Sequence, residues 1–249
     1  MNTFSVAVVI GLAMALAPTV HAAELRVLTG GSMTAVWGEL KPKFEHASGH
    51  TLDVFFGTTP NLIKEATSGK PFDLGVVPAE VMQDAAARAR FAAGPTLDIA
   101  RVGLGVAVRS GATKPDIGTA DALKAALLKA QSIATLPASA AGAQVMKTFE
   151  RLGIGEAIKG KLQAKGAPAE IVQAVTKGEA ELGVFALNVL TAPGLEVVGP
   201  FPAELQQEVV FTTAPALDTK QAEAAKALIA YLKSPEAVAV LKAKGMTPG

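Results

Sequence analysis

The sequence contains no cysteine, three histidines, one tryptophan and one tyrosine. The absence of cysteine excludes disulfide bonds, thiol catalysis and thiolate metal sites. His21 lies in the N-terminal apolar segment, and His46 and His50 alone are too few for a transition-metal site. No Ser-His-Asp order, metal-ligand spacing or nucleotide-binding loop is present. We therefore expect neither a metal nor a cofactor.

The chain also lacks an excess of either charge. Its 23 Lys and Arg residues nearly balance 22 Asp and Glu residues, which gives a net charge of +1 at pH 7. Nucleic acids and anionic membranes bind strongly basic surfaces, so this balance indicates neither partner. Half of the residues, 50%, are hydrophobic, which is enough to form a substantial core.

An apolar segment at the N-terminus is typical of a secretory signal. The run Val6–Ala15 is too short to span a bilayer, and Val20-His21-Ala22 supplies the small residues of a signal-peptidase site. We predict a signal peptide over 1–22, with cleavage after Ala22 or one residue later; a buried N-terminal helix is the alternative. No later segment predicts a membrane span, so we expect a soluble periplasmic protein without membrane insertion.

Three β-type apolar runs each end in small hydroxyl or glycine residues that open a helix. The segments after these runs are Gly30-Gly31-Ser32, Gly57-Thr58-Thr59-Pro60 and Pro137–Gly142. A helix N-terminus presents unpaired N–H groups and a partial positive charge, so it binds an anion without a cationic side chain. Ser and Thr are also ordinary N-caps, which explains any one of these turns structurally. Their repetition predicts a receptor for a small anion.

Strand-like and helix-like segments alternate along the chain. The first half reads Leu25–Thr29, Met33–His46, Leu52–Phe56, Asn61–Ser68, Leu74–Val77 and Ala79–Arg90. This βαβαβα order predicts a parallel sheet covered by helices, with ligands beyond the carboxyl ends of the strands. Two long strands, Ile99–Arg109 and Gln207–Thr213, bracket a second α/β block.

These segments predict an α/β fold of two domains, with mostly parallel sheets flanked by helices and two crossover strands. The first domain is expected to be discontinuous, at residues 23–103 and 207–249, and the second at 104–206. The ligand would lie in the cleft between them. We expect a monomer.

Short motifs along nearly the whole mature chain match a known pattern. They are Thr29-Gly30-Gly31-Ser32-Met33, Phe56–Leu62, Phe72-Asp73-Leu74, Leu182-Gly183-Val184 and Tyr231–Ala237. In their order and spacing, the chain resembles the type II periplasmic solute-binding proteins, in particular the molybdate-binding component of ABC transporters. The resemblance implies a two-domain binding-protein fold, a small anionic ligand between the domains and an ABC permease as partner.

The resemblance also implies where the ligand binds. The family's oxyanion site uses a Ser at each of the first two helix starts, backbone N–H groups of the second domain, and a Tyr after the Leu-Gly strand. Ser32 matches the first position, and Thr58 or Thr59 stands at the second. Ser139 and the backbone from Ala140 would supply the second-domain donors.

The tyrosine of that family is missing. Ala186 occupies the corresponding place, which removes one donor and enlarges the cleft. Asn188 either replaces it as a polar contact or caps the next turn. Arg101, near the start of a crossover strand, either grips a carboxylate in the cleft or is a surface arginine at a strand edge. Both alternatives remain open for each residue.

Two further segments, Ala100–Gly103 and Val197–Leu205, are similar to a divergent branch of the family that includes aconitate isomerase. This similarity implies an organic anion as ligand. It also supplies a second hypothesis, a cofactor-independent periplasmic isomerase of an unsaturated tricarboxylate. Such an enzyme needs a base beside the acidic C–H, but Glu39, Glu65 and the two remaining histidines lie outside the predicted turns. No catalytic residue is assigned, and binding is favoured over catalysis.

Overall fold

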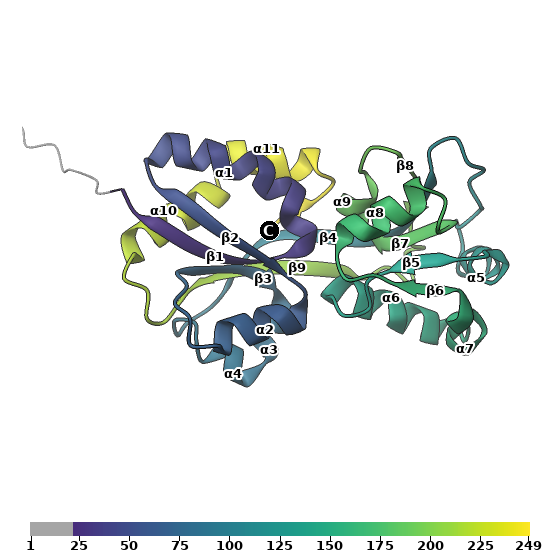
Figure 1. Ribbon diagram of the computed structural model, residues 1–249, viewed down its shortest axis with the longest axis horizontal. Helices are drawn as coiled ribbons and strands as arrows, with labels where there is room; N and C mark the ends of the chain where they lie inside the picture. The colour runs from purple at the N-terminus through teal and green to yellow at the C-terminus, as the bar shows by residue number, and fades with distance from the viewer. Residues whose placement is uncertain (1–21) are drawn as a thin grey trace, which may run out of the picture.

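The computed structural model describes residues 22–249, which form two lobes side by side along the longest axis (Figure 1). The predicted signal peptide lies outside these residues, apart from Ala22, so its cleavage site stays a prediction. Within the described part of the chain, no helix has the length and hydrophobicity needed to cross a membrane.

Lobe 1 is built on three parallel strands with β1 in the middle. These strands are β1 (Glu24–Gly30), β2 (Thr51–Gly57) and β3 (Leu74–Pro78). One face carries α1 (Thr34–Ser48), which follows the 3-10 turn η1 (Gly31–Met33), together with α10 (Ala222–Leu232) and α11 (Pro235–Ala243). The other face carries α2 (Thr59–Thr67), α3 (Ala79–Gln83) and α4 (Ala85–Arg88) (Figure 1).

Lobe 2 repeats this arrangement on a smaller scale, with β5 between two parallel neighbours. Its strands are β5 (Ile133–Thr135), β6 (Leu162–Ala164), β7 (Leu182–Ala186) and β8 (Leu195–Pro200). Its helices are α5 (Ala120–Lys129), α6 (Ala140–Arg151), α7 (Gly155–Ile158), the 3-10 turn η2 (Lys159–Lys161), α8 (Pro168–Thr176) and α9 (Leu187–Leu190).

Two long antiparallel strands, β4 (Leu97–Arg109) and β9 (Glu208–Pro215), connect the lobes. Up to Gly103, β4 pairs with β9; from Leu104 onward it pairs with β7 and β8. The final strand, β10 (Thr247–Pro248), returns to β4 in lobe 1. This change of partner coincides with the predicted end of the first domain segment, although the domain boundaries themselves stay a prediction.

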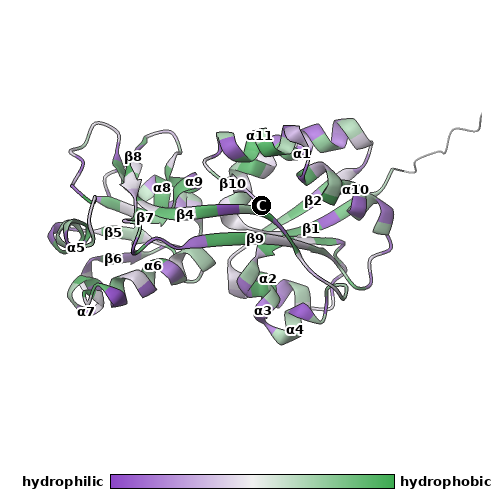
Figure 2. Ribbon diagram, turned by 180° about the vertical axis from the view of Figure 1, so that it is seen from behind, coloured by the Kyte–Doolittle hydropathy of each residue, from purple (hydrophilic) through white to green (hydrophobic). Residues whose placement is uncertain are grey.

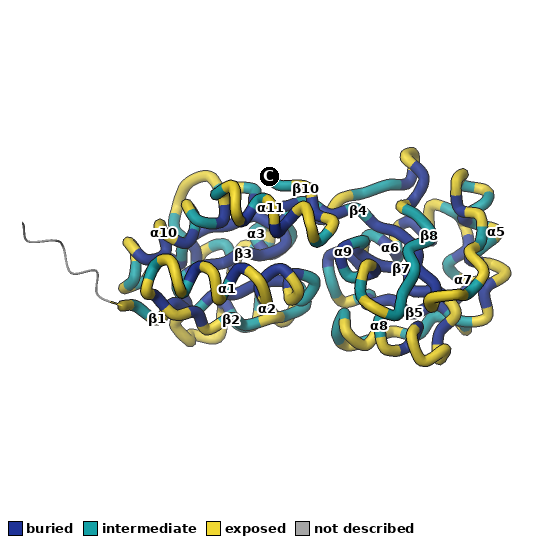
Figure 3. Tube along the Cα trace, turned by 90° about the horizontal axis from the view of Figure 1, so that it is seen from above, coloured by how far each residue is buried: buried dark blue, intermediate teal, exposed yellow. Residues whose placement is uncertain are grey.

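The expected α/β fold with two crossing strands is confirmed. The strands within each βαβ unit are parallel, as predicted. The crossing strands pair antiparallel because one leaves lobe 1 and the other returns to it, so each sheet is mixed. Figure 2 shows that the crossing strands are largely hydrophobic, and Figure 3 that exposed residues gather on the outer helices.

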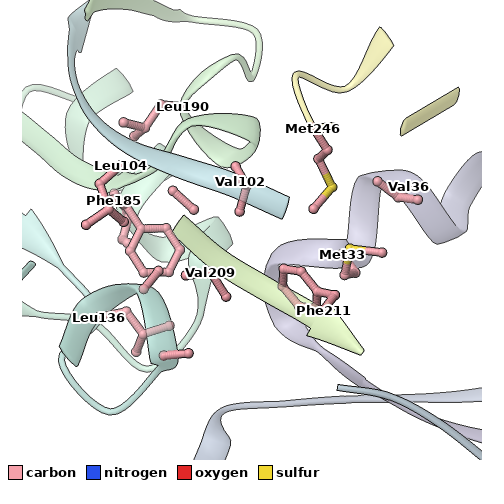
Figure 4. Close-up of a cluster of buried hydrophobic side chains, with 14 of the residues drawn as sticks. Met33, Val36, Val102, Leu104, Leu136, Phe185, Leu190, Val209, Phe211 and Met246 are labelled. Atoms are coloured by element: carbon pink, nitrogen blue, oxygen red, sulfur yellow. The ribbon is translucent and has the colours of Figure 1, made fainter. Parts of the chain in front are cut away.

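A continuous hydrophobic cluster runs through both lobes along β4 and β9 (Figure 4). Val102 and Val209 lie on the crossing strands, with Met33 on the lobe 1 side and Leu136 and Phe185 on the lobe 2 side. Each of these side chains is at most 2% exposed. Burial of this size is the main stabilising contribution to such a fold, so the connection between the lobes is part of the core.

The predicted helix over Ala79–Arg90 is wrong in one respect. The structure divides it into α3 and α4, with Asp84 extended between them at φ −73° and ψ 120°. The Asp84 carboxylate accepts a hydrogen bond from the N–H of Ala87 at 2.8 Å, as an N-cap does. Asp competes with the helix backbone for such N–H groups, which explains why a new helix begins here.

The single tyrosine provides a pH-dependent test of how α10 and α11 pack. Tyr231 donates a hydrogen bond of 3.1 Å to Glu236, which also pairs with Lys43 at 2.8 Å. Burial raises the pKa of Tyr231 to about 12, and the hydrogen bond to Glu236 adds to this shift. A raised pKa means that the neutral phenol stabilises the fold. This stabilisation is complete below the unfolded pKa of about 10 and is lost as the pH rises towards 12.

Absorbance at 295 nm follows Tyr231 alone in this chain. We expect a midpoint near pH 12 in the folded protein and a lower midpoint for Glu236→Gln, with circular dichroism confirming that both remain folded. A midpoint near pH 10 for the folded parent would contradict this packing.

Candidate anion site

A cavity of about 570 Å³ lies between the lobes and is lined by residues of both. Four helices of at least nine residues begin at its wall: α1 and α2 from lobe 1, and α6 and α8 from lobe 2. The first N–H groups of each helix have no partner within the helix, and each N-terminus carries roughly half a positive charge. The positive ends of four helix dipoles therefore lie at the cavity, together with the C-terminal end of α11 at Ala243.

On the lobe 1 side, Ser32, Thr58 and Thr59 all line the cavity. Ser32 lies in η1, the tight turn between β1 and α1. Thr58 is the N-cap of α2 in an extended conformation, but its side chain caps no N–H of the helix. The Thr59 hydroxyl is buried without a hydrogen-bond partner among residues 22–249. A buried hydroxyl of this kind is stabilised by any ligand that accepts a hydrogen bond from it.

On the lobe 2 side, Ser139 and Ala140 also line the cavity. The Ser139 oxygen accepts from the N–H of Gly142 at 3.0 Å, and its hydroxyl donates to the carbonyl of Leu136 at 2.9 Å. Its proton is thereby committed within the protein. The donors that remain here are the backbone N–H groups of Ala140 and Ala141, the first two residues of α6.

Asn188 connects the lobes at this cavity. It lies in the short helix α9, is only 5% exposed, and lines the cavity. Its Nδ2 donates to the carbonyl oxygen of Ser32 at 2.7 Å, across the gap between lobe 2 and lobe 1. Of the two alternatives for Asn188, capping of the next turn is not seen, because the side-chain amide makes this contact instead. Its Oδ1 is buried and has no partner in the described part of the chain.

The structure does not bring Arg101 to the cavity. Its guanidinium pairs with Asp98 at 2.9 Å, three residues earlier on β4, and the two side chains are 44% and 38% exposed. Strand alternation places the neighbours Ala100 and Val102 in the core, at 0% and 2% exposed, and Arg101 on the other face. In this arrangement the surface alternative describes Arg101.

Sequence reasoning missed two parts of the lining. One is the start of α8, where Ala167 and Pro168 reach the cavity; Pro at the first position of a helix is a recognisable start signal. The other is Lys244, directly after α11. No sequence signal identified Lys244, because α11 reaches the cavity only through the return of the chain to lobe 1.

The lining of the cavity carries very few ionisable side chains. Among residues 22–249, Lys244 is the one ionisable side chain that lines the cavity, and no acidic side chain does so. The bases considered for catalysis, Glu39, Glu65, His46 and His50, do not line it. Glu65 pairs with Arg26 at 2.7 Å, and His50 accepts from the N–H of Ala23 at 3.1 Å. The site is suited to holding negative charge by neutral donors rather than to proton transfer.

The position of the family's tyrosine is occupied by Ala186, which is fully buried at the end of β7. The preceding residue, Phe185, reaches the cavity instead. An aromatic side chain thus lies beside the position at which the resemblance implies a tyrosine hydroxyl.

Comparison with known proteins agrees with this architecture. A family model described as bacterial extracellular solute-binding protein matches residues 25–247. The chain is 33% identical to an aconitate isomerase of a Pseudomonas species over 232 residues, 90% of this chain and 87% of that protein. It is 29% identical to the molybdate-binding protein ModA of Azotobacter vinelandii over 246 residues, 92% of each chain.

The solved structure of the periplasmic molybdate-binding protein of Azotobacter vinelandii has the same fold. Its TM-score is 0.76 at 18% sequence identity, with 90% of this chain and 98% of that chain covered. The matched family model spans both lobes, both crossing strands and every helix that begins at the cavity. The chain therefore belongs to the bacterial extracellular solute-binding proteins, as a type II member similar to the molybdate-binding branch.

Proposed function

We propose that this protein is a monomeric periplasmic receptor that captures a small anion between its lobes and presents it to an ABC-type permease. One observation carries the proposal: four helix N-termini from two lobes line one cavity that has no acidic side chain among the described residues. Helix N-termini bind anions through N–H groups and dipoles together. The predicted signal peptide supports the periplasmic location.

Both lobes take part in the proposed site, so the ligand would favour the arrangement in which they are together. A ligand shifts a conformational equilibrium only through its different affinity for the two states. Here an anion reached from Thr58 on one side and Ala140 on the other would bind fully only when the lobes meet. Direct contacts between lobes, such as Asn188 with Ser32, support the same arrangement.

Isomerisation of a tricarboxylate is the second candidate, supported by the 33% identity to an aconitate isomerase. That reaction needs a group that takes up a proton beside the substrate carbon. Among the described lining residues only Lys244 ionises, and it is held in an ion pair with Glu39. We therefore place binding before catalysis.

A thermal-shift panel on the exported protein tests the proposal. The anions are molybdate, tungstate, sulfate, phosphate, succinate, citrate, cis-aconitate and trans-aconitate, with choline and glucose as non-anionic controls. An anion at a hundred times its dissociation constant should stabilise the protein by about 2.7 kcal/mol, and the controls should not.

The same aconitate samples are then analysed for conversion between the cis and trans isomers. We expect stabilisation without turnover. Stabilisation by no anion would refute the receptor, and conversion that depends on the protein would establish the isomerase instead.

A further inference from the structure

The cavity has a second polar end that the helix N-termini do not explain. Lys244, directly after α11, stands at this end, and Asn188 on α9 lies between it and the helix N-termini. Their backbone segments are adjacent, since a Cβ added to Gly245, the residue after Lys244, would lie 3.9 Å from the Cα of Asn188. One comes from each lobe, so this end, like the first, is complete only where the lobes meet.

The ion pair of Lys244 with α1 holds its ammonium away from the helix N-termini. Its ammonium forms an ion pair with Glu39, in the second turn of α1. Glu39 follows Thr34, the first residue of that helix, by five residues, which correspond to about 7.5 Å along the helix axis at 1.5 Å per residue. An ammonium has three N–H donors, so the pairing with Glu39 leaves donors for a second acceptor. The Lys244 side chain is 29% exposed, and Lys244 lines the cavity.

Asn188 adds an acceptor between Lys244 and the helix N-termini. The backbone carbonyl of Ser32 can only accept a hydrogen bond, so the Asn188 amide must direct its Nδ2 towards that oxygen. The distance between the two atoms is 2.7 Å. This fixes Oδ1 as the remaining acceptor, and Oδ1 is buried without a donor among the described residues. Burying an unpaired acceptor costs roughly 1–3 kcal/mol, which a ligand hydroxyl or protonated carboxyl would relieve.

The walls of the cavity are largely hydrocarbon. Phe56, Phe185 and Phe211 line the cavity, and its volume is about 570 Å³. Four oxygen-sized groups occupy roughly 120 Å³ at the share of about 30 Å³ that each water molecule has in the liquid. A tetrahedral oxyanion would therefore fill only part of the cavity.

We infer that Lys244 is a ligand-binding residue that selects organic anions with two separated acidic groups. One carboxylate lies at the helix N-termini, the carbon skeleton lies against the aromatic walls, and the second carboxylate pairs with Lys244. Asn188 accepts from a hydroxyl or protonated carboxyl of the same ligand. This inference rests on the proposed function, because it assigns the chemical class of the captured anion.

Calorimetry with chosen anions tests the inference in parent and variant proteins. The probes are succinate and citrate, which carry separated carboxylates, and acetate, sulfate and molybdate, which do not. Lys244→Met keeps the aliphatic length without the charge and should weaken succinate and citrate binding at least tenfold. Lys244→Arg keeps the charge and should retain most of the affinity. Lys242→Met, on an exposed lysine in the last turn of α11, is the matched control and should change nothing.

Each outcome separates the inference from the proposed function. Unchanged succinate and citrate affinity in Lys244→Met would overturn the role of Lys244. A parent that binds molybdate or sulfate but neither carboxylate probe would overturn the ligand class and leave the anion receptor standing. A parent that binds none of the anions would refute the receptor itself. If Lys244→Met unfolds at a lower temperature than the parent without ligand, Lys244→Arg is compared with the parent instead. Loss of succinate and citrate binding in a folded Lys244→Arg variant would contradict a role that depends on the positive charge.

Discussion

Replacing Ala140 by aspartate is expected to abolish anion binding while leaving the protein folded. Ala140 is the first residue of α6 and lines the cavity, so the new carboxylate would occupy the place of the anion. Two like charges about 4 Å apart repel by about 4 kcal/mol at an effective dielectric constant of 20, roughly a thousandfold in affinity. An acidic side chain at a helix N-terminus stabilises the helix by about 0.3–1 kcal/mol. This offsets part of the cost of placing a carboxylate at a position that is only 5% exposed, and thermal unfolding checks that the variant remains folded.

Ala143→Asp is the matched control for this substitution. Ala143 lies in the first turn of the same helix but is exposed and outside the cavity lining. Titration calorimetry with the anion that stabilises the parent most should show a loss of at least a hundredfold for Ala140→Asp and less than about threefold for Ala143→Asp. Equal effects of the two substitutions would mean that the anion does not bind at the start of α6.

Most of the residues chosen from the sequence for the site lie at one cavity. Ser32, Thr58, Thr59, Ser139 and Ala140 all follow strands of parallel βαβ units. The carboxyl ends of parallel strands meet at one edge of a sheet, which predicts convergence within each lobe. The prediction that the two lobes share one cleft rested on the two long strands that bracket the second block and on the family resemblance. Whether these residues bind an anion stays a prediction until it is measured.

The parts of the site that escaped prediction depend on contacts between distant segments. Lys244 reaches the cavity because the chain returns to lobe 1 after β9, and Asn188 bonds Ser32, 156 residues away. Arg101 was a candidate ligand-binding residue because of its charge, but Asp98 on the same strand holds its guanidinium outside the cavity. A side chain with several possible partners is not placed by the spacing of residues along the sequence.

Gly142→Ala is expected to destabilise the protein by about 3 kcal/mol and to lower its melting temperature by about 6–12 °C. A Cβ at Gly142 would lie 1.7 Å from the carbonyl oxygen of Leu136 and 2.9 Å from the Cα of Pro137. Both atoms belong to the backbone, so no side-chain rotation relieves the overlap. The same carbonyl accepts the hydrogen bonds of Ser139, which means that the start of α6 must shift and anion affinity should fall as well.

Gly38→Ala is the same chemical change with the opposite expected sign. Gly38 is exposed within α1, and nothing lies within 4 Å of an added Cβ. Alanine loses less backbone entropy in a helix than glycine does, so this variant should gain about 0.5–1 kcal/mol. Thermal unfolding followed by circular dichroism compares both variants with the parent. A Gly142→Ala variant that melts within about 3 °C of the parent would show that the backbone before α6 yields easily, and the rigid helix start on which the proposed anion site depends would then be refuted.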